Sequence, residues 1–539
     1  MTTRRTFLAS TGTAVLSAGI PALRIPGRAD YDLVIRGGTI FDGAGGPGVE
    51  SDLAVLQGRV LRIARRIPGK GREELDARGK AVMPGFVDIH SHVDGSLSED
   101  PRAESAIRQG ITTVIAGQDG GSRATGADDK PFDAMLAAID ALRPAVNVAS
   151  MVGLGSVRGA VVGADDRPAT PEELRRMTAM VERAVAGGAC GASSGLEYTP
   201  GAFASRDELV ALCRPLAGTR LPYATHMRNE DDRVLDSIDE SIAVARGAGC
   251  PLQISHLKTQ GPRNWGKLDD AFARIDAARR GGLDVAFDRY PYVAYWTGLT
   301  NLFPVWSRDG GTDAFFARLD DPAVEPRIRT ETLAKVTLIG GWDNVQVSAV
   351  RAEEDRAAEG KRLGTYAAGK GADPYAEAIG LLRRSGGNVG MVGFAMSEEN
   401  LERILAHPLG MVCTDGGGFA VDGPTRRGSP HPRGIGSYPR VLARYVRDRG
   451  TLTLGAAVRK MSAFPASRVR LADRGRLAVG MAADIVVLDP ARVEDRATFD
   501  APFQYPVGMT AVIVNGAVAL HDDTRRAEGA GRTLRPGRR

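Results

Sequence analysis

Two histidines stand two residues apart at the end of an apolar run. The sequence GFVDIHSHVD covers residues 85–94, and His90 and His92 alternate there with Ser91 and Val93. In an extended strand, residues two apart point to the same face. Both imidazoles can therefore face one point, and neutral imidazole is a common metal ligand. A pair of structural histidines buried in a core is the alternative, and the rest of the chain has to decide between the two.

The middle of the chain alternates between strand-like and helix-like patterns. Helical periodicity covers 171–188 and 232–249, and short apolar runs precede and follow these segments. Parallel strands joined by crossover helices form α/β folds, and eight such strands close into a barrel. We therefore predict an α/β protein whose main unit is a (β/α)8 TIM-type barrel. The eight predicted strands are 85–90, 110–116, 147–152, 191–195, 222–227, 251–256, 284–291 and 410–415.

Residues that can bind a metal follow these strands at one end. In a barrel of this type the C-terminal ends of the strands converge on the active site, whereas histidines scattered in a core would show no such preference. The pattern favours a metal centre over the structural interpretation. The residues at or just beyond strand ends are His90, Asp119, His226, His256 and Asp415.

Both ends of the chain contain short β-rich runs separated by Gly and Asp turns, as in YDLVIRGGTIFDGAG (31–45) and ADIVVLDP (483–490). Because the termini of a domain often lie close together, we expect one small β-sandwich domain built from both ends. The long gap between the last two barrel strands predicts an insertion over the barrel mouth. The predicted division is a signal peptide over 1–29, sandwich parts over 30–82 and 470–520, the barrel over 83–469 with its insertion at about 292–409, and a basic disordered tail over 521–539.

The first residues have the layout of a twin-arginine export signal. Arg4-Arg5 precedes Phe7-Leu8 and a short, mildly apolar stretch rich in small residues. We therefore expect the mature protein in the periplasm. The formal net charge of +5 is small for 539 residues, and no aromatic or folded basic face accompanies the basic tail, so a nucleic-acid partner is not expected. No internal apolar run is long enough to span a bilayer as a helix.

Taken together, these motifs resemble the amidohydrolase superfamily, and within it the N-acyl-D-amino-acid deacylases (D-aminoacylases). The resemblance covers nearly everything from residue 30 to 520, and each motif is weak alone but specific in this order and spacing. It rests on PGFVDIHSHVD (84–94), GITTVIAGQDGGS (110–122), SSGLEYTPG (193–201), ATHMRNE (224–230), QISHLK (253–258), DRYPY (288–292), CTDGG (413–417), HPRGIGSYPRVLARYV (431–446) and DRGRLAVGMAADIVVLDP (473–490).

The resemblance implies a role for each matching residue. His90 and His92 match a first metal pair, and His226 and His256 match a second pair that holds the tightly bound zinc. Asp415 matches the general base and acid, which also touches a metal. The matches for the substrate are Lys258, Arg433 and Tyr290 at its α-carboxylate, and Tyr198 at the carbonyl of the scissile amide.

The chain departs from these relatives at two positions. Asp119 stands where the deacylases carry a cysteine that ligates the tight zinc, so a harder oxygen donor replaces a thiolate. We expect the site to persist, with weaker zinc binding or easier exchange for another divalent ion; a simple turn residue is the alternative for Asp119. Leu154 stands where relatives often carry a histidine, which puts the orientation of the substrate in doubt.

The resemblance implies hydrolysis of the linear amide of an N-acyl-D-amino acid by water activated on one or two zinc ions, giving a carboxylate and a free D-amino acid. A cyclic-amide hydrolase (hydantoinase-like) or a dipeptidase of the same superfamily is the alternative, but these use a carbamylated lysine that has no match here. An inactive periplasmic binding protein is a further alternative. Because 295–306 contains no basic residue, a neutral or apolar D-amino acid is favoured. The oligomeric state stays open.

Overall fold

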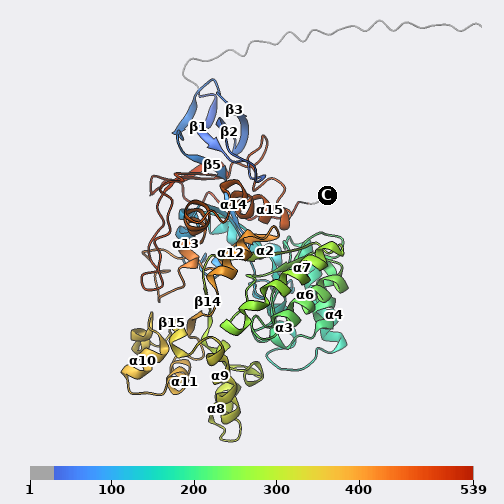
Figure 1. The fold of residues 1–539 in the computed structure, drawn as a ribbon. Helices are drawn as coiled ribbons and strands as arrows, with labels where there is room; N and C mark the ends of the chain where they lie inside the picture. Colours follow the sequence, from blue (N-terminus) through green and yellow to red (C-terminus); the bar gives the residue numbers. More distant parts are fainter. Residues whose placement is uncertain (1–28, 538–539) are drawn as a thin grey trace, which may run out of the picture.

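The structure is a computed structural model that describes residues 29–537. Apart from its last residue, the predicted signal peptide (1–29) lies outside the described residues. In Figure 1 a β-domain near the N-terminus sits on one side of the barrel, and the insertion lies on the opposite side. Within the described part of the chain, no helix combines the length and the apolar character needed to cross a membrane.

All eight predicted strands are present in the structure, and together they make up the barrel wall. This confirms the predicted fold class. They lie in two parallel sheets, one in the order β6-β7-β8 and the other in the order β17-β13-β12-β11-β10-β9. The predicted strand 147–152 serves both sheets, because its first part pairs with β7 and its last part pairs with β10. The wall strands are β6 (Phe86–Asp88), β7 (Ile111–Ala116), β8 (Asn147–Ser150), β9 (Val152–Gly153), β10 (Ala192–Gly195), β11 (Tyr223–His226), β12 (Leu252–Ile254), β13 (Val285–Arg289) and β17 (Gly410–Val412).

The segments that follow β6 and β17 bring the two ends of this wall together. The backbone N–H of Asp415 donates to the carbonyl of His90 at 2.9 Å, and the N–H of His92 donates to the carbonyl of Gly416 at 2.9 Å. Thr414 also donates its backbone N–H to the side chain of Asp88 at 2.9 Å. These bonds place the loop after the last strand directly beside the loop after the first.

The barrel helices begin and end where local sequence chemistry favours it. In α4 (Pro171–Ala186), Thr170 and Glu173 form a reciprocal capping box, and Pro171 occupies the first turn, where a backbone N–H is not needed. In α6 (Val234–Ala248), Gly249 adopts φ 70° and ends the helix. The other helices outside the insertion are α1 (Glu104–Arg108), α2 (Phe132–Ala141), α3 (Leu154–Val161), α5 (Arg206–Cys213), α7 (Leu268–Arg280), α12 (Glu398–Ala406), α13 (Arg433–Arg440), α14 (Leu454–Met461) and α15 (Ala463–Arg468).

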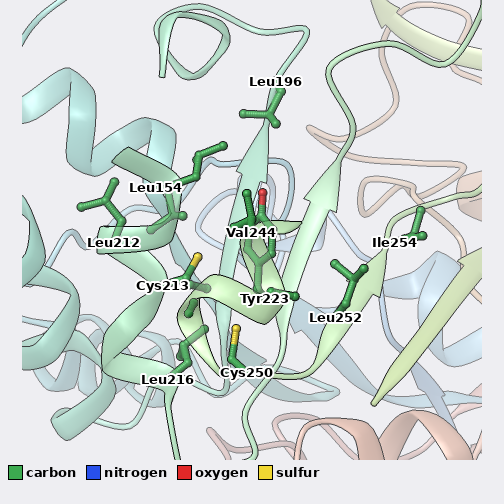
Figure 2. Packing of buried hydrophobic residues seen from close by; sticks show 14 of the residues in the cluster. Leu154, Leu196, Leu212, Cys213, Leu216, Tyr223, Val244, Cys250, Leu252 and Ile254 are labelled. Carbon is green, nitrogen blue, oxygen red and sulfur yellow. The ribbon is translucent and has the colours of Figure 1, made fainter. Parts of the chain in front are cut away.

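Apolar side chains fill the space between the wall strands and these helices. Tyr223, Leu252 and Ile254 point outward from β11 and β12 and pack against residues of the helical layer, including the free thiols Cys213 and Cys250 (Figure 2). Burial of this apolar surface stabilises the wall at roughly 25 cal/mol per Å². The strands are thereby held rigidly at the ends that carry the candidate ligands.

The segment between β13 and α12 forms a unit of its own beyond the barrel mouth, and α12 returns to the barrel and packs against β17. Its three strands form an antiparallel sheet in the order β14-β16-β15. Four helices pack around this sheet, seen in yellow-green to orange in Figure 1. The elements are β14 (Ala294–Gly298), β15 (Val345–Ala349), β16 (Gly390–Phe394), α8 (Gly311–Asp320), α9 (Glu325–Leu338), α10 (Leu363–Gly369) and α11 (Pro374–Arg384).

Strands from both ends of the chain join in one nine-stranded sheet. The link is β5 (Ala81–Pro84), which pairs with both β1 (Tyr31–Ile40) and β18 (Ile485–Leu488). Successive side chains of β18 point to opposite faces of the sheet, and both faces are buried. Ile485 and Val487 face the core of the sheet domain, whereas Val486 and Leu488 face the barrel. The remaining strands are β2 (Val49–Leu56), β3 (Arg59–Ala64), β4 (Gly71–Asp76), β19 (Met509–Val514), β20 (Ala517–His521) and β21 (Thr524–Arg525).

The predicted disorder of the tail 521–539 is wrong for the part that the structure describes. The N–H of Val148 donates to the carbonyl of Arg532 at 3.0 Å, and the N–H of Leu534 donates back to the carbonyl of Val148 at 2.8 Å. Leu534 is buried in the cluster that also contains the inward-facing Ala149 and Ala224 of the barrel. The tail is fixed by backbone hydrogen bonds, by polar contacts such as that of the Thr533 hydroxyl with Asp140, and by one buried apolar side chain, and none of these needs a periodic side-chain pattern.

Replacing this anchor is expected to destabilise the fold. Leu534→Ala should lower the free energy of unfolding by about 2–3 kcal/mol, because it leaves a cavity beneath the barrel. Urea denaturation followed by circular dichroism measures the change. The exposed neighbour Arg535 provides the control, since Arg535→Ala should stay within about 0.5 kcal/mol of the parent. Equal stability of Leu534→Ala and the parent would contradict this account of the tail.

Candidate metal centre

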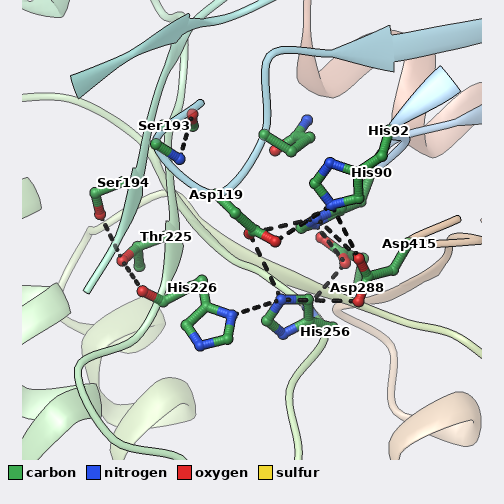
Figure 3. Close-up of polar contacts among 12 residues, drawn as sticks. His90, His92, Asp119, Ser193, Ser194, Thr225, His226, His256, Asp288 and Asp415 are labelled. Atoms are coloured by element: carbon green, nitrogen blue, oxygen red, sulfur yellow. Dashed lines mark hydrogen bonds and ion pairs between the residues drawn. The ribbon is translucent and has the colours of Figure 1, made fainter. Parts of the chain in front are cut away.

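The six predicted metal ligands meet in one place at the barrel mouth (Figure 3). His90 and His92 follow β6, Asp119 follows β7, His226 ends β11, His256 follows β12 and Asp415 follows β17. Their donor atoms form two compact groups, and within each group all donor atoms lie within 4.8 Å of one another. The first group is His90, His92, Asp119 and Asp415, and the second is Asp119, His226 and His256.

Asp119 belongs to both groups and lies between the histidine pairs. Its Oδ1 is 3.3 Å from Nε2 of His90 and 3.6 Å from Nε2 of His256, and its Oδ2 is 3.3 Å from Nε2 of His92. Burial alone would raise the pKa of this carboxyl, but His90 and His256 hold it well below its usual range. Asp119 is therefore a carboxylate, the form that binds a metal, and its position between the two histidine pairs fits the prediction that it is a ligand.

A tight turn after β7 aims Asp119 at the centre. Asp119 itself has φ 51°, in the left-handed region, and Gly117 before it has φ 70°. A Cβ on Gly117 would lie 2.1 Å from the carbonyl oxygen of Met151, so only glycine fits there. The Gln118 side chain donates to the carbonyl of Ile89 at 2.9 Å and ties the turn to the loop that carries the first histidine pair.

The histidines are supported from behind by acidic residues. On three of the rings, the nitrogen that points away from the centre faces a carboxylate, an arrangement that orients the ring and fixes its tautomer in metal sites. The distances are 3.4 Å from His226 Nε2 to Glu197, 3.1 Å from His256 Nδ1 to Glu230, and 3.6 Å from His90 Nδ1 to Asp288.

Sequence reasoning did not single out these three carboxylates, although all of them lie within quoted motifs. Asp288 stands inside the predicted apolar strand 284–291, where a buried carboxylate requires partners. Its Oδ1 accepts the backbone N–H of His256 at 2.8 Å. Glu230 lies four residues beyond His226, and Glu197 directly precedes Tyr198. A charged residue in or beside a strand end was the available signal.

The donor set fits a divalent metal. Among the described residues, both ring nitrogens of His90 and Oδ1 of Asp119 are buried and have no hydrogen-bond partner. Buried polar atoms without partners are costly, and the convergence of two of them, Nε2 of His90 and Oδ1 of Asp119, indicates a bound group between them. Imidazole nitrogens mixed with carboxylate oxygens suit zinc and neighbouring divalent metals.

A cavity of about 1170 Å³ opens above this centre. Five of the six metal-ligand candidates line it, all except the fully buried His90, and Tyr295, Trp296, Thr297 and Asn301 of the insertion form one wall. All four predicted substrate residues also line it, namely Tyr198, Lys258, Tyr290 and Arg433. A small organic substrate can therefore reach the metal-ligand candidates and the predicted binding residues at the same time.

Both predicted substrate cations already contact carboxylates of the protein. Lys258 Nζ lies 2.6 Å from Glu230 and 2.7 Å from Nδ1 of His256. Arg433 Nη1 lies 2.8 Å from Oδ2 of Asp415. Their positions agree with substrate binding, yet each also orients a residue of the centre, so their roles in substrate binding stay predictions.

The two predicted tyrosines differ in their partners. The Tyr290 hydroxyl is buried and has no hydrogen-bond partner among the described residues, so it can serve a ligand in the cavity. The Tyr198 hydroxyl accepts a hydrogen bond from Thr297 at 3.4 Å, and its ring lies 4.7 Å from the ring of His226. Leu154 is buried in the apolar layer behind the wall (Figure 2) and packs there as a core residue.

The chain is similar to known proteins over most of its length. The model of the Amidohydrolase family matches residues 73–389 and 418–520. N-acyl-D-glutamate deacylase of Alcaligenes xylosoxydans xylosoxydans is 37% identical over 520 residues, which cover 94% of this chain and 96% of the relative.

Solved structures show the same likeness. N-acyl-D-glutamate deacylase from Bordetella bronchiseptica, complexed with zinc and a phosphonate that mimics the tetrahedral intermediate of its reaction, superposes with a TM-score of 0.80 at 35% identity, over 94% of this chain and 99% of that one. A structure of D-aminoacylase, from work on its binuclear metal centre, gives a TM-score of 0.80 at 33% identity, over 94% and 100%.

Changing Asp119 should change metal binding at both donor groups. Asp119→Ala should weaken zinc binding by more than the roughly 10–100-fold that the loss of an outer partner costs. Asp119→Cys should bind zinc and raise its preference over manganese, because a thiolate is the softer donor. Metal content after dialysis against equal zinc and manganese measures both effects.

Asp94 provides a matched control for this experiment. It lines the same cavity as Asp119 but belongs to neither donor group. Asp94→Ala should therefore retain the parental metal content. Parental metal content in Asp119→Ala would show that this carboxylate is not a ligand.

Proposed function

This chain belongs to the amidohydrolase family, and we propose that within it the chain is a metal-dependent N-acyl-D-amino-acid deacylase. The reaction is hydrolysis of a linear amide, which gives a carboxylate and a free D-amino acid. The observation that supports it best is Asp119, which lies between two histidine pairs at the base of a cavity that also contains the unpartnered hydroxyl of Tyr290. Close relatives named for this chemistry add to that support.

The protein residues divide the work of the reaction. When bound by the histidines and Asp119, a zinc ion supplies a Lewis acid that polarises a carbonyl and lowers the pKa of water to about 7. Asp415 belongs to the first donor group, with Oδ1 3.2 Å from Nε2 of His92, and its Oδ2 lies 3.9 Å from Nε2 of His256 in the second. Burial would raise the pKa of its carboxyl, but Arg433 and the histidines lower it, so Asp415 is ionised and accepts the proton of the attacking water. It then returns that proton to the departing amide nitrogen.

The remaining residues orient the substrate. Arg433 stacks over the ring of Tyr290, with its guanidinium carbon 4.5 Å from the ring centre. This pair presents a cation and a free hydroxyl on one side of the centre, where they bind the α-carboxylate together with Lys258. The Tyr198 hydroxyl, on the side of His226, polarises the acyl carbonyl. With the carboxylate and the carbonyl fixed, the side chains of the D and L isomers leave Cα in different directions, and this difference is the basis of the proposed stereospecificity.

We propose a neutral or apolar side chain for the preferred D-amino acid. The wall formed by the insertion presents mainly aromatic and uncharged residues, among them Tyr295, Trp296 and Thr300, and its charged residue in the cavity lining is Arg351. Arg308, the first basic residue of this region, is buried and donates to the backbone carbonyl of Glu197 at 3.1 Å. Arg123 and Arg351 line the cavity from exposed positions.

The alternatives have less support. Hydantoinase-like and dipeptidase sites of the superfamily bridge their metals with a carbamylated lysine, but here Asp119 takes the position between the histidine pairs. The nitrogen of Lys258 is instead held by Glu230 and His256. An inactive binding protein has no use for buried histidine and aspartate donors without partners, since each costs free energy.

We also propose export to the periplasm by the twin-arginine route. The support is the pattern of residues 3–22, with Arg4-Arg5 before Phe7-Leu8, and its position directly before the first strand of the fold. Fractionation of cells that produce the full chain, beside a variant with both arginines changed to lysine, tests this route. Equal export of the two chains would overturn it.

The D-isomer specificity has a direct test. Mature protein incubated with paired N-acetyl-D and N-acetyl-L amino acids should release free amino acid only from the D members, and removal of metal should abolish the release. Leucine, phenylalanine and glutamate pairs separate the side-chain preference, with the glutamate pair expected to be slowest. Release from the L members would support amide hydrolysis but contradict the D specificity. If the protein hydrolysed added hydantoins and none of the N-acetyl amino acids, the result would support the cyclic-amide alternative.

Lys258→Met distinguishes substrate binding from ligand support. If Lys258 binds the α-carboxylate, KM should rise by about 10–100-fold, since a hydrogen bond to a charged group contributes about 1.5–3 kcal/mol. Metal content, measured in the same preparation, should stay parental. Loss of metal with an unchanged KM after reloading would assign Lys258 to the support of His256 instead.

A further inference from the structure

Side chains of the insertion hold the loop that follows β10. Asn301 Nδ2 donates to Oε2 of Glu197 at 3.1 Å, and Arg308 donates to the backbone carbonyl of the same glutamate at 3.1 Å. Thr297 donates to the hydroxyl of Tyr198 at 3.4 Å. Hydrogen bonds from the insertion thus hold Glu197 and Tyr198, two consecutive residues of a barrel loop, in place.

Glu197 in turn contacts His226, one of the metal-ligand candidates. Its Oε2, the atom bound by Asn301, lies 3.4 Å from Nε2 of His226. The other ring nitrogen of His226, Nδ1, lies 3.1 Å from Nε2 of His256 and faces the donor group that includes Asp119. A proton on Nε2 that is held by the carboxylate leaves the Nδ1 lone pair free for a metal.

The insertion also supplies positive charge next to Glu197. Lys335 of α9 is buried, and its ammonium lies 2.5 Å from Asp231. Lys335 acts electrostatically on both Asp231 and Glu197, so the carboxyl group that bonds to Asn301 lies within reach of a buried cation. An ionised carboxylate is the form that accepts a hydrogen bond from both Asn301 and His226.

We propose that Asn301 is a positioning residue of the metal centre: by holding Glu197 against Nε2 of His226, it makes the insertion a structural part of the Asp119–His226–His256 metal site. The inference rests on the metal dependence of the proposed function but not on the identity of the substrate. Asn301 also lines the cavity, yet the donor of its side-chain amide is directed to Glu197. Metal binding without substrate therefore separates this role from a contact with substrate.

The test is zinc titration of metal-free protein in competition with a chromophoric chelator, with no substrate present. Glu197→Gln should weaken the tighter zinc by about 10–100-fold, the range for losing an outer partner of a ligand. Asn301→Leu and Asn301→Ala should weaken it in the same direction and by no more than Glu197→Gln. Circular dichroism of both Asn301 variants verifies that they fold.

Asn388 offers a matched control. It is an asparagine of the same insertion that lines the same cavity, and its side chain donates to the nearby carbonyl of Gly386. Asn388→Leu should leave zinc affinity unchanged.

The double variant Asn301→Leu/Glu197→Gln completes a double-mutant cycle, which measures whether the effects of the two substitutions are independent. If Asn301 acts through Glu197, the double variant should bind zinc like Glu197→Gln alone. Parental zinc affinity in the Asn301 variants, or an effect that adds in full to that of Glu197→Gln, would overturn the proposal. Because no turnover is measured, a failure of the proposed deacylase activity would appear only in the assay of amino acid release, so the two outcomes remain distinguishable.

Discussion

Convergence of buried charged and polar groups at the barrel mouth is the constraint on which this structure depends. Imidazoles and carboxylates removed from water cost several kcal/mol each unless they find partners. Here each buried group has, on its outer side, a partner of complementary charge or hydrogen-bonding character. Histidines surround Asp119, the carboxylates of Glu197 and Glu230 stand behind the histidines, and Lys258 and Lys335 stand behind those carboxylates. Each of these side chains contacts another member of the set, so a change in the position of one side chain disturbs its neighbours.

The barrel and the insertion meet this constraint in different ways. Short strands packed against helices fix the points from which the ligands leave the wall, and the glycine-dependent turn after β7 fixes Asp119. The insertion supplies outer partners that the barrel loops do not provide, such as Asn301 for Glu197 and Lys335 for Asp231. A single cavity therefore has a rigid base formed by one unit and a wall formed by another.

The sequence predicted the barrel, its eight strands and all six metal-ligand candidates, because strand ends and ligand chemistry are both local patterns. The supporting carboxylates escaped prediction because their role depends on which ring nitrogen they face. Asp288, for example, contacts both His90 and the backbone of His256, and no spacing encodes that contact. The ion pairs of Lys258 and Arg433 are likewise set by tertiary approach. The tail failed as a prediction because backbone pairing with Val148 leaves no side-chain pattern.

The pairing of the two chain ends determines the order in which the molecule can be completed during synthesis. β1–β5 leave the ribosome first, but β5 pairs with β18, and the apolar core that they share needs residues made some 400 positions later. The last described residues then close the space beneath the barrel through Leu534. Contacts between positions so far apart in sequence form slowly. In a nascent chain of this protein, β1–β5 can pair with one another at once, but the edge of β5 that faces β18 stays unpaired until residues 485–488 have been made.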